Sequence, residues 1–425
     1  MQALRTPAAL LLVSALAAYA NAFGGSFQFD DFNVIVREGA VHSLGAWWES
    51  MPGIRPLLKL SYALSWSAGG GTLAFHAVNV ALHAANVLLV WALLRELWRR
   101  MGVEQAPAAA FAGALLFALH PAHTEAVTYI SGRSVSMMAF FYLASLLAYL
   151  RGAPRWASPA LFLAALATKE VAVTLPVALL LCEALDLRRP FHLRVALVRQ
   201  APHWLVLAGG VALMAALSRY QEMLAASLAL RPFAEQLHLQ VAAIARHAGV
   251  LILALPPNID PELPAIPPLA GLAILAAIGV GLSLLRIQPW YALALLWFFL
   301  HLAPTNSLLA RADPANDRQL YLASIGPLAL AGLAIVRLPR WRTAAIVLVA
   351  AALGASTIVR NQDYRSEVAL WRDTVRKSPG SARALNNLGY AFQLEGRRDE
   401  ARRAYERALE LDPELIQARI NLKGL

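Results

Sequence analysis

The sequence predicts an all-α, polytopic membrane protein of about eleven transmembrane helices, followed by a short helical repeat domain at the C-terminus. Hydrophobic residues make up 59% of the 425 residues, and the mean hydropathy is +0.53. Only 15% of the residues are charged, against about a quarter in a soluble protein. The apolar residues gather into runs of membrane-spanning length, and the composition becomes charged after residue 360. We therefore divide the chain into a membrane domain, 1–360, and a repeat domain, 361–425.

The net charge of +11 does not indicate a nucleic-acid-binding protein, because the arginines fall in short loops between apolar runs. Such loops are rich in Lys and Arg on the cytoplasmic side of a membrane. The one cysteine, Cys182, lies in an apolar run, so the sequence offers no disulfide framework. No nucleic-acid partner is expected.

The first apolar run, 7–23, has the length of a membrane span, although Ala20-Asn21-Ala22 near its end is similar to a signal-peptide cleavage site. We expect an uncleaved span, because cleavage would leave the acidic pair that follows close to a free terminus. The outer loop, 24–71, mixes Trp47, Trp48 and Arg55 with apolar residues. This mixture favours short helices that lie along the membrane surface.

Further apolar runs follow, and each is interpreted as one span, although several are shorter than the roughly 20 residues that usually cross a membrane. The expected spans are 7–23, 72–94, 107–120, 133–150, 157–168, 170–186, 201–218, 268–285, 290–303, 319–336 and 343–359.

Another apolar stretch, 240–255, contains Arg246 and His247. If it crossed the membrane, every later loop would change sides, and Arg286 and the arginines of 337–342 would face outward, against the positive-inside rule. We therefore expect 240–255 to be re-entrant or to lie at the interface. The bias to Ala, Leu and Arg is typical of a GC-rich bacterium. The expected location is the bacterial inner membrane, with a cytoplasmic N-terminus and a periplasmic C-terminal domain.

Two adjacent carboxylates, Asp30 and Asp31, lie in the outer loop between Phe29 and Phe32. An ionised Asp in hydrocarbon costs roughly 2.5–3.5 kcal/mol, so the pair lies in water beyond the lipid or in a polar cavity. Successive side chains of an extended segment point to opposite faces, so the two carboxylates are expected to differ in role. A solvated acidic loop is the alternative.

A polar stripe marks the expected helix 72–94, where His76, Asn79, His83 and Asn86 share one face. Polar side chains within a membrane face the bundle interior. We expect interhelical hydrogen bonds from this stripe, with substrate contact as the alternative.

The segment after the third expected span carries His120, His123 and Glu125, and Arg133 follows it. Two His and one Glu can bind a metal ion, but their spacing is too generic to assign one. No metal site is predicted, and a divalent cation is possible without being indicated. These groups could instead orient an Asp or a phosphate through hydrogen bonds.

Two further groups lie on the same side of the membrane. Lys169 and Glu170 separate two short apolar runs, where a solvated turn is the alternative, and Arg318 and Tyr321 open the tenth expected span. Arg binds phosphate through a bidentate fork. A carboxylate that takes a proton from an acceptor hydroxyl, together with cations that stabilise a departing phosphate, suits sugar transfer from a lipid-phosphate donor.

Residues 382–415 follow the thirty-four-residue tetratricopeptide pattern of two packed helices. Trp371 and Pro379 lie one repeat length before Tyr405 and Pro413, so the second helix of a preceding unit is also present. Fewer than three repeats rarely stand alone, so we expect this domain to pack on the membrane domain or on a protein partner. The pattern residues are Leu385, Leu388, Gly389, Phe392, Ala401, Tyr405, Ala408 and Pro413.

These motifs together resemble the integral-membrane glycosyltransferases of the GT-C type. The likeness is greatest to the transmembrane-and-tetratricopeptide-repeat O-mannosyltransferase family and its bacterial relatives. The matching stretches are Phe29-Asp30-Asp31, Arg55-Pro56-Leu57, His120-Pro121-Ala122-His123-Thr124-Glu125-Ala126-Val127, Thr168-Lys169-Glu170 and Asp317-Arg318-Gln319-Leu320-Tyr321-Leu322.

The resemblance implies an inverting transfer of a sugar from a polyprenyl-phosphate-linked donor to a protein or glycan hydroxyl at the outer face. It implies Asp30 as the base and Asp31 as an assisting group. The implied phosphate contacts are Lys169, Arg318 and Arg133. The implied supporting residues are Arg55, His120, His123, Glu125, Glu170 and Tyr321.

Two other functional classes remain open. A transporter or flippase for lipid-linked sugars would use the polar stripe as its path, although it should show inverted repeats. A membrane scaffold would use the tetratricopeptide repeat to hold partners. The sugar and the acceptor are not specified by the sequence.

Overall fold

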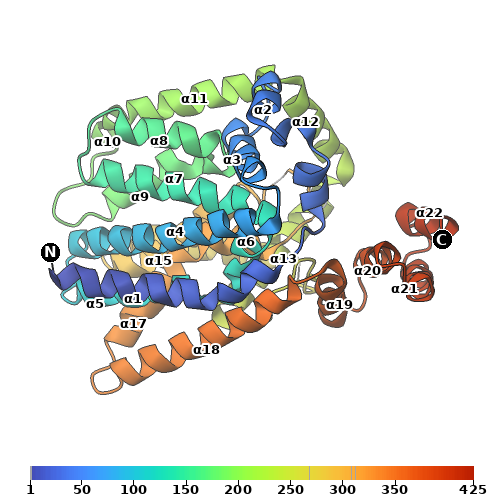
Figure 1. The fold of residues 1–425 in the computed structure, drawn as a ribbon. Coiled ribbons are helices and arrows are strands. Elements are labelled where there is room, and N and C mark those ends of the chain that lie inside the picture. The colour runs from blue at the N-terminus through green and yellow to red at the C-terminus, as the bar shows by residue number, and fades with distance from the viewer. Residues whose placement is uncertain (1, 268, 308, 312) are drawn as a thin grey trace.

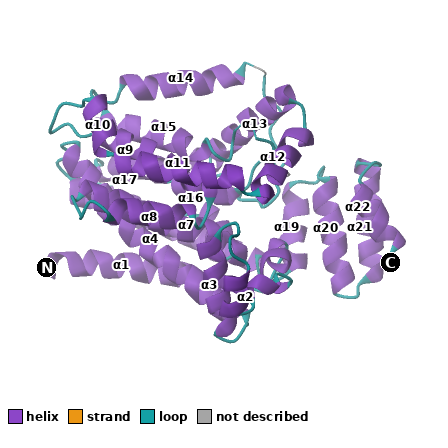
Figure 2. Cartoon of the chain, turned by 90° about the horizontal axis from the view of Figure 1, so that it is seen from above, coloured by secondary structure: helices purple, strands orange, loops and turns teal. Residues whose placement is uncertain are grey.

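The computed structural model describes residues 2–267, 269–307, 309–311 and 313–425, and every regular element in these ranges is helical (Figures 1 and 2). The predicted all-α fold class is therefore confirmed. A bundle of long helices forms the body of the molecule, and the C-terminal helices extend from one end of it. The N-terminus lies at the other end of the bundle.

The bundle helices share one hydrophobic core. Small residues let two of these helices touch: a Cβ built on Gly332 would lie 2.4 Å from the backbone nitrogen of Gly113. Such close backbone approach is typical of helix pairs in membranes. The core helices are α1 (Gln2–Ala18), α4 (Thr72–Arg100), α5 (Ala106–Leu119), α7 (Arg133–Leu150), α8 (Ala157–Leu166), α9 (Leu175–Ala184), α15 (Pro289–Leu302) and α17 (Ile325–Val336).

Within the described ranges, four helices are long and apolar enough to cross a membrane, and up to six if each of two bent pairs counts as one span. The four are Thr6–Gly24, Thr72–Arg100, Ile130–Leu150 and Arg342–Asp363. Several other expected spans are shorter apolar helices, such as the 14-residue α5. The helices support a membrane protein, while the count of eleven spans stays a prediction.

The last bundle helix, α18 (Arg342–Asp363), exposes Val347, Leu348 and Val359. An apolar helix face left open on the outside of a bundle suits contact with lipid. The remaining helices of the bundle are α10 (Leu193–Arg199), α11 (Ala201–Ala216), α12 (Ser218–Leu230), α13 (Phe233–Ile252) and α14 (Ala270–Ser283).

The stretch 240–255 falls largely within α13. Its polar residues are engaged inside the protein: Arg246 donates to the Pro256 carbonyl at 2.7 Å, and His247 lies 2.8 Å from Gln319 Oε1. Gln240 accepts a hydrogen bond from Asn306 at 2.9 Å. The helix is not among those that pass as candidate spans. Its re-entrant or interfacial placement stays a prediction.

The loop 24–71 contains short helices, as predicted. They are joined by side-chain contacts such as the 2.9 Å hydrogen bond from Trp47 Nε1 to the Pro56 carbonyl. The helical segments are η1 (Ala20–Gly24), η2 (Phe32–Val36), η3 (Gly39–Val41), α2 (Leu44–Glu49) and α3 (Pro56–Ser67).

The polar stripe of α4 is buried and makes the expected hydrogen bonds between elements. His76 Nε2 lies 3.2 Å from the Gly25 carbonyl. Asn79 donates to the carbonyls of Val127 and Ile130. The predicted interhelical role of the stripe is therefore confirmed.

The repeat domain consists of α19 (Glu367–Lys377), α20 (Ala382–Leu394), α21 (Arg398–Leu411) and α22 (Ile416–Lys423). It packs on the membrane domain, as expected. Asp373 of α19 forms an ion pair with Arg360 of α18, with 2.6 Å between Oδ2 and Nη1. The Ser378 hydroxyl donates to the Asp260 carbonyl at 3.0 Å.

Candidate active site

The candidate site lies at the end of the bundle from which the repeat domain extends (Figure 1). Short helical segments connect the long helices there and carry most of the predicted residues. They are η4 (Pro121–His123), α6 (Thr124–Val127), η5 (Ile130–Gly132), η6 (Glu170–Thr174), η7 (Asp317–Gln319) and α16 (Leu320–Ala323).

The two carboxylates of the acidic pair have different environments. Asp31 is fully buried, and its two oxygens accept the backbone N–H groups of Ser131 at 2.8 Å and Gln28 at 3.0 Å. The Asp30 side chain is 39% exposed and lies 3.8 Å from Arg318 Nη1. Asp31 therefore braces the loop, while Asp30 is the carboxylate that a substrate could reach.

The repeat domain holds the backbone that presents Asp30. Phe29 has a φ of 46°, which is uncommon for a residue other than glycine. Its N–H donates to Glu367 of α19 at 2.6 Å, and its ring meets the Trp371 ring edge-on at 5.2 Å. The Asp30 N–H donates to the Tyr129 hydroxyl at 2.8 Å. Contacts from α19 and from the α5–α7 connection thus fix this turn.

Arg318 connects the acidic residues of the site. Its Nη1 lies 3.8 Å from Asp30, its Nε lies 3.4 Å from Glu125, and its backbone N–H donates to Glu125 at 3.1 Å. Glu125 is buried. One guanidinium is therefore shared by a buried carboxylate, which orients it, and a partly exposed one.

Arg318 also lines a pocket with Lys169 and Arg311. Val135, Met138, Val171 and Leu322 form an apolar wall of the same pocket. A site with clustered cations beside an apolar wall fits an amphipathic anion. The pocket also includes Asn316, whose buried side-chain oxygen and nitrogen have no hydrogen-bond partner among the residues that the structure describes. A bound polar group could satisfy both atoms.

A second pocket lies on another side of Arg318 and is more acidic. Glu125, Asp260 and Asp313 line it, and Trp371 and Arg383 of the repeat domain also contribute. Arg383 forms ion pairs with both Asp260 and Asp313. The repeat domain therefore forms part of the wall of this pocket.

The pair Arg55 and Glu170 joins the outer loop to the Lys169 turn. Arg55 Nε and Nη2 donate to the Glu170 carboxylate at 3.0 and 2.8 Å, and the Tyr220 hydroxyl donates to it at 2.8 Å. Lys169 itself donates to the Ser134 hydroxyl at 3.1 Å. The Arg55–Glu170 pair thus positions the turn that presents Lys169.

Arg133 is engaged elsewhere and departs from its expected role. Its guanidinium donates to Asn79, to Ser65 and to the carbonyls of Ser61 and Phe75 at 2.7–3.0 Å. The side chain is fully buried. Because these contacts use all three of its nitrogens, we correct the expectation: Arg133 braces the site and is left out of the phosphate contacts.

His120, His123 and Tyr321 are buried behind the site. His123 Nε2 lies 3.0 Å from the Ser324 hydroxyl, and the Tyr321 hydroxyl lies 2.8 Å from His83 Nδ1. These residues support the packing of α5 against α16. Among the described residues, no group of three or more His, Cys, Asp or Glu side chains could hold a metal ion.

The surroundings shift the pKa values of four groups. Burial raises the pKa of Asp30, against the attraction of Arg318. Burial raises the pKa of Asp31 to about 7, although the hydrogen bonds that Asp31 accepts oppose this shift. Burial also raises the pKa of Glu125 to about 7, although the nearby charge of Arg318 opposes this shift. Burial lowers the pKa of Lys169, and the nearby guanidinium of Arg318 lowers it further.

Sequence reasoning missed Arg311, Asn316 and Asp260. Arg311 could have been found, because it is a cation in the same outer segment as Arg318. Asp260 lies 123 residues before its partner Arg383, so no local pattern connects the two.

The family models match one segment, a tetratricopeptide repeat at residues 382–415, which confirms the predicted repeat. The protein O-mannosyl-transferase Tmtc1 of Drosophila melanogaster is 36% identical over 206 residues, which cover 41% of this chain and 22% of that protein. The protein O-mannosyl-transferase TMTC4 of Mus musculus is 32% identical over 158 residues, or 32% of this chain and 21% of that protein.

The chain is similar to the TMTC protein O-mannosyl-transferases. A longer match, to the protein O-mannosyl-transferase Tmtc3 of Drosophila melanogaster, is 24% identical and covers 88% of this chain and 50% of that protein. The TMTC-like resemblance inferred from the motifs is confirmed, and the bacterial origin stays a prediction. The chain spans at most about half the length of these relatives. No solved structure matches it significantly.

Proposed function

We propose that this TMTC-like chain is a glycosyltransferase of about eleven spans that uses a polyprenyl-phosphate-linked sugar. It transfers the sugar to a protein or glycan hydroxyl at the outer face of the membrane. The N-terminus lies in the cytoplasm and the repeat domain in the periplasm. One observation supports this most: the accessible Asp30 carboxylate lies 3.8 Å from Arg318, which lines the same pocket as Lys169 and Arg311.

The proposed reaction is a single displacement. Asp30 accepts the proton of the acceptor hydroxyl, and the hydroxyl oxygen attacks the anomeric carbon of the sugar. The bond from this carbon to the phosphate oxygen breaks, and the polyprenyl phosphate leaves with the bonding electrons. Attack from the face opposite the leaving group inverts the anomeric carbon. A positioned base contributes about 10²–10⁴ to the rate of such a step.

The cations of the pocket stabilise the charge that develops on the leaving phosphate. Arg318 and Lys169 are the proposed phosphate contacts, and Arg311 joins them because it lines the same pocket. The apolar wall that includes Val135 and Met138 would receive the first isoprene units. The acidic pocket walled by Trp371 and Arg383 would receive the acceptor. The relatives are named for protein O-mannosylation, which supports a protein hydroxyl as the acceptor.

The test is sugar transfer from a radiolabelled polyprenyl-phosphate donor in proteoliposomes. Asp30→Asn keeps the shape of the side chain but removes the base, so the rate should fall by about 10²–10⁴, or roughly 3–5 kcal/mol of barrier. Donor binding should be retained, because the phosphate contacts are unchanged. Glu49→Gln is the matched control, since it removes an exposed carboxylate from the same loop. Transfer by Asp30→Asn at the rate of the control would refute the mechanism.

A further inference from the structure

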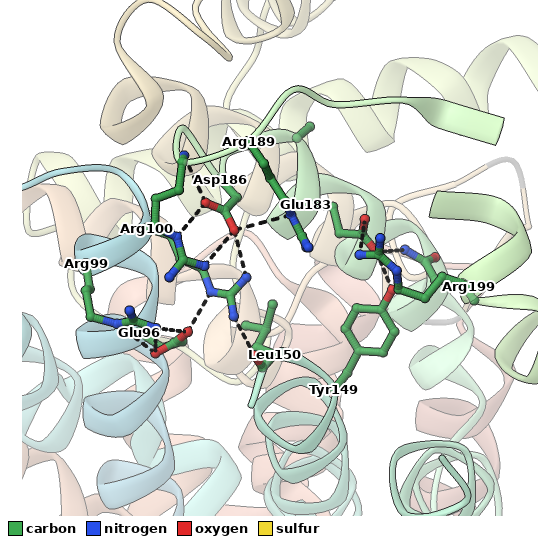
Figure 3. Close-up of polar contacts among 12 residues, drawn as sticks. Glu96, Arg99, Arg100, Tyr149, Leu150, Glu183, Asp186, Arg189 and Arg199 are labelled. Carbon is green, nitrogen blue, oxygen red and sulfur yellow. Dashed lines mark hydrogen bonds and ion pairs between the residues drawn. The ribbon is translucent and has the colours of Figure 1, made fainter. Parts of the chain in front are cut away.

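A cavity of about 720 Å³ lies at the other end of the bundle from Asp30. The turns after α4, α7 and α9 and the start of α11 enclose it. We call it the arginine pocket, after the lining residues Arg100, Arg155, Arg188, Arg189 and Arg199. Figure 3 shows the polar contacts around its edge.

The arginine pocket and the candidate active site lie toward opposite ends of one candidate membrane span, Ile130–Leu150. Helix α7 of this span contributes Val135 and Met138 to the pocket that Arg318 lines, and Tyr149 and Leu150 to the arginine pocket. The segment from Val135 to Leu150 rises about 22 Å, a large part of the ~30 Å hydrocarbon core of a bilayer. We therefore expect the arginine pocket near the lipid headgroups of the leaflet opposite the candidate active site.

The carboxylates near the pocket neutralise its five arginines only in part. Asp186 is shared by Arg100 at 2.9 Å, Arg188 at 2.8 Å and Arg189 at 3.6 Å (Figure 3). Glu96 also pairs with Arg100 at 2.7 Å, and Glu183 pairs with Arg199 at 3.2 Å. Arg155 has no hydrogen bond or ion pair with any residue in the described part of the chain. The positive-inside bias accounts for arginines in such loops, but not for their convergence on one cavity.

Two other features indicate what the pocket receives. His203 lines it, and the buried Nδ1 of this residue has no hydrogen-bond partner in the described part of the chain. Val198 and Leu205 also line it and are exposed, as is the neighbouring Trp156. Free phosphate would leave this apolar rim in water, whereas the acyl chains of a lipid would cover it.

We propose that the arginine pocket binds the phosphate headgroup of an anionic phospholipid. Clusters of Lys and Arg at the cytoplasmic ends of membrane helices attract such lipids, and basic pockets between helices bind their headgroups. The pocket lacks the accessible carboxylate that distinguishes the Asp30 site, so its role is binding. This proposal does not depend on the glycosyltransferase activity.

The experiment measures phosphatidylglycerol binding to the full-length protein by native mass spectrometry, with phosphatidylcholine as the neutral comparison. The variant Arg155→Gln/Arg189→Gln removes two charges while Asp186 keeps Arg100 and Arg188 as partners. The matched control is Arg340→Gln/Arg342→Gln, which removes two exposed arginines, one from the turn before α18 and one from the first residue of this helix. The control turn is predicted to face the same side of the membrane.

The wild-type protein and the control should retain phosphatidylglycerol, whereas the pocket variant should bind it roughly tenfold to thirtyfold more weakly. Equal binding of phosphatidylcholine, or equal loss in both double variants, would overturn the proposal. Displacement of phosphatidylglycerol by millimolar inorganic phosphate would also overturn it, because the pocket would then be a free-phosphate site. An unchanged gel-filtration profile of the pocket variant confirms that any loss of lipid does not result from unfolding.

Discussion

The two ends of the bundle both gather cations, but they surround them differently. At the end that carries the candidate active site, Arg318 is held by buried Glu125 and lies beside the partly exposed Asp30. At the other end, Arg100, Arg188 and Arg189 share the buried Asp186. The shared carboxylate of the candidate active site is therefore 39% exposed, whereas that of the arginine pocket is fully buried.

This difference separates binding from catalysis. A cluster of cations is sufficient to hold a phosphate, whereas glycosyl transfer also needs a base within reach of the acceptor hydroxyl. In the proposed mechanism, Asp30 is this base. Its backbone is fixed by Glu367 and Trp371 of the repeat domain, so the repeat domain contributes to the geometry of the base.

After Asp30→Asn, the largest effect should come from Arg318→Gln, which removes the charge shared by Asp30 and Glu125. Loss of one electrostatic contact to a developing charge costs about 10²–10³ in rate, and the transfer assay in proteoliposomes measures it. Arg340→Gln removes an exposed charge far from the site and serves as control. If both variants transfer sugar equally well, the outer pocket is no more catalytic than the arginine pocket.

A smaller effect is expected for Lys169→Met, which removes a phosphate contact but leaves the base. A hydrogen bond to a charged group is worth about 1.5–3 kcal/mol, or roughly tenfold to a hundredfold. We expect weaker donor binding and slower turnover, whereas Asp30→Asn changes turnover alone. Measuring donor binding separately from transfer distinguishes the two variants. Donor affinity equal to that of the wild type would exclude Lys169 as a phosphate contact.

Several predicted site residues meet in the structure, and they could be selected from the sequence because they lie in short segments that join apolar runs. Topology alone placed Asp30, Glu125, Lys169 and Arg318 on one side of the membrane, and the structure brings them to one end of the bundle. The sequence could not distinguish the buried Arg133 from Lys169 and Arg318. The residues that surround the Arg133 guanidinium are 54–72 residues away along the chain.

The sequence did not predict the bend at the end of the expected span 201–218. Hydropathy predicts where apolar runs begin and end, but the bend between α11 and α12, which is 81°, depends on tertiary packing.

The arginine pocket could not be predicted from the sequence either, because arginines in loops between spans are already explained by membrane topology. Their convergence on one cavity requires α4, α7 and α9 to end, and α11 to begin, at the same level.

The pH dependence of transfer should be a narrow bell. Asp30 must be ionised to act as base, and burial raises its pKa, so the acid limb of the pH–rate curve moves to higher pH. Lys169 must be protonated to bind phosphate, and burial lowers its pKa, so the alkaline limb of the curve moves to lower pH. On each limb the rate should change about tenfold per pH unit. The rate of Lys169→Met measured against pH should lose the alkaline limb; retention of that limb would assign it to another group.

The smallest effect on transfer should come from Ala401→Trp in the repeat domain. Ala401 is fully buried in α21, and close packing of α20 on α21 already places the Tyr405 ring against Gly389. Overfilling such a contact costs typically 1–3 kcal/mol, so limited proteolysis should cleave within 382–425 while the membrane domain stays intact. Because α19 still holds Phe29, transfer should fall less than in Lys169→Met. Arg402→Trp places the same ring at an exposed neighbour and should remain resistant to protease. Equal protease resistance of Ala401→Trp and Arg402→Trp would contradict the packing of the repeat. If Ala401→Trp lost as much transfer activity as Arg318→Gln, α20 and α21 would also be needed to position the base.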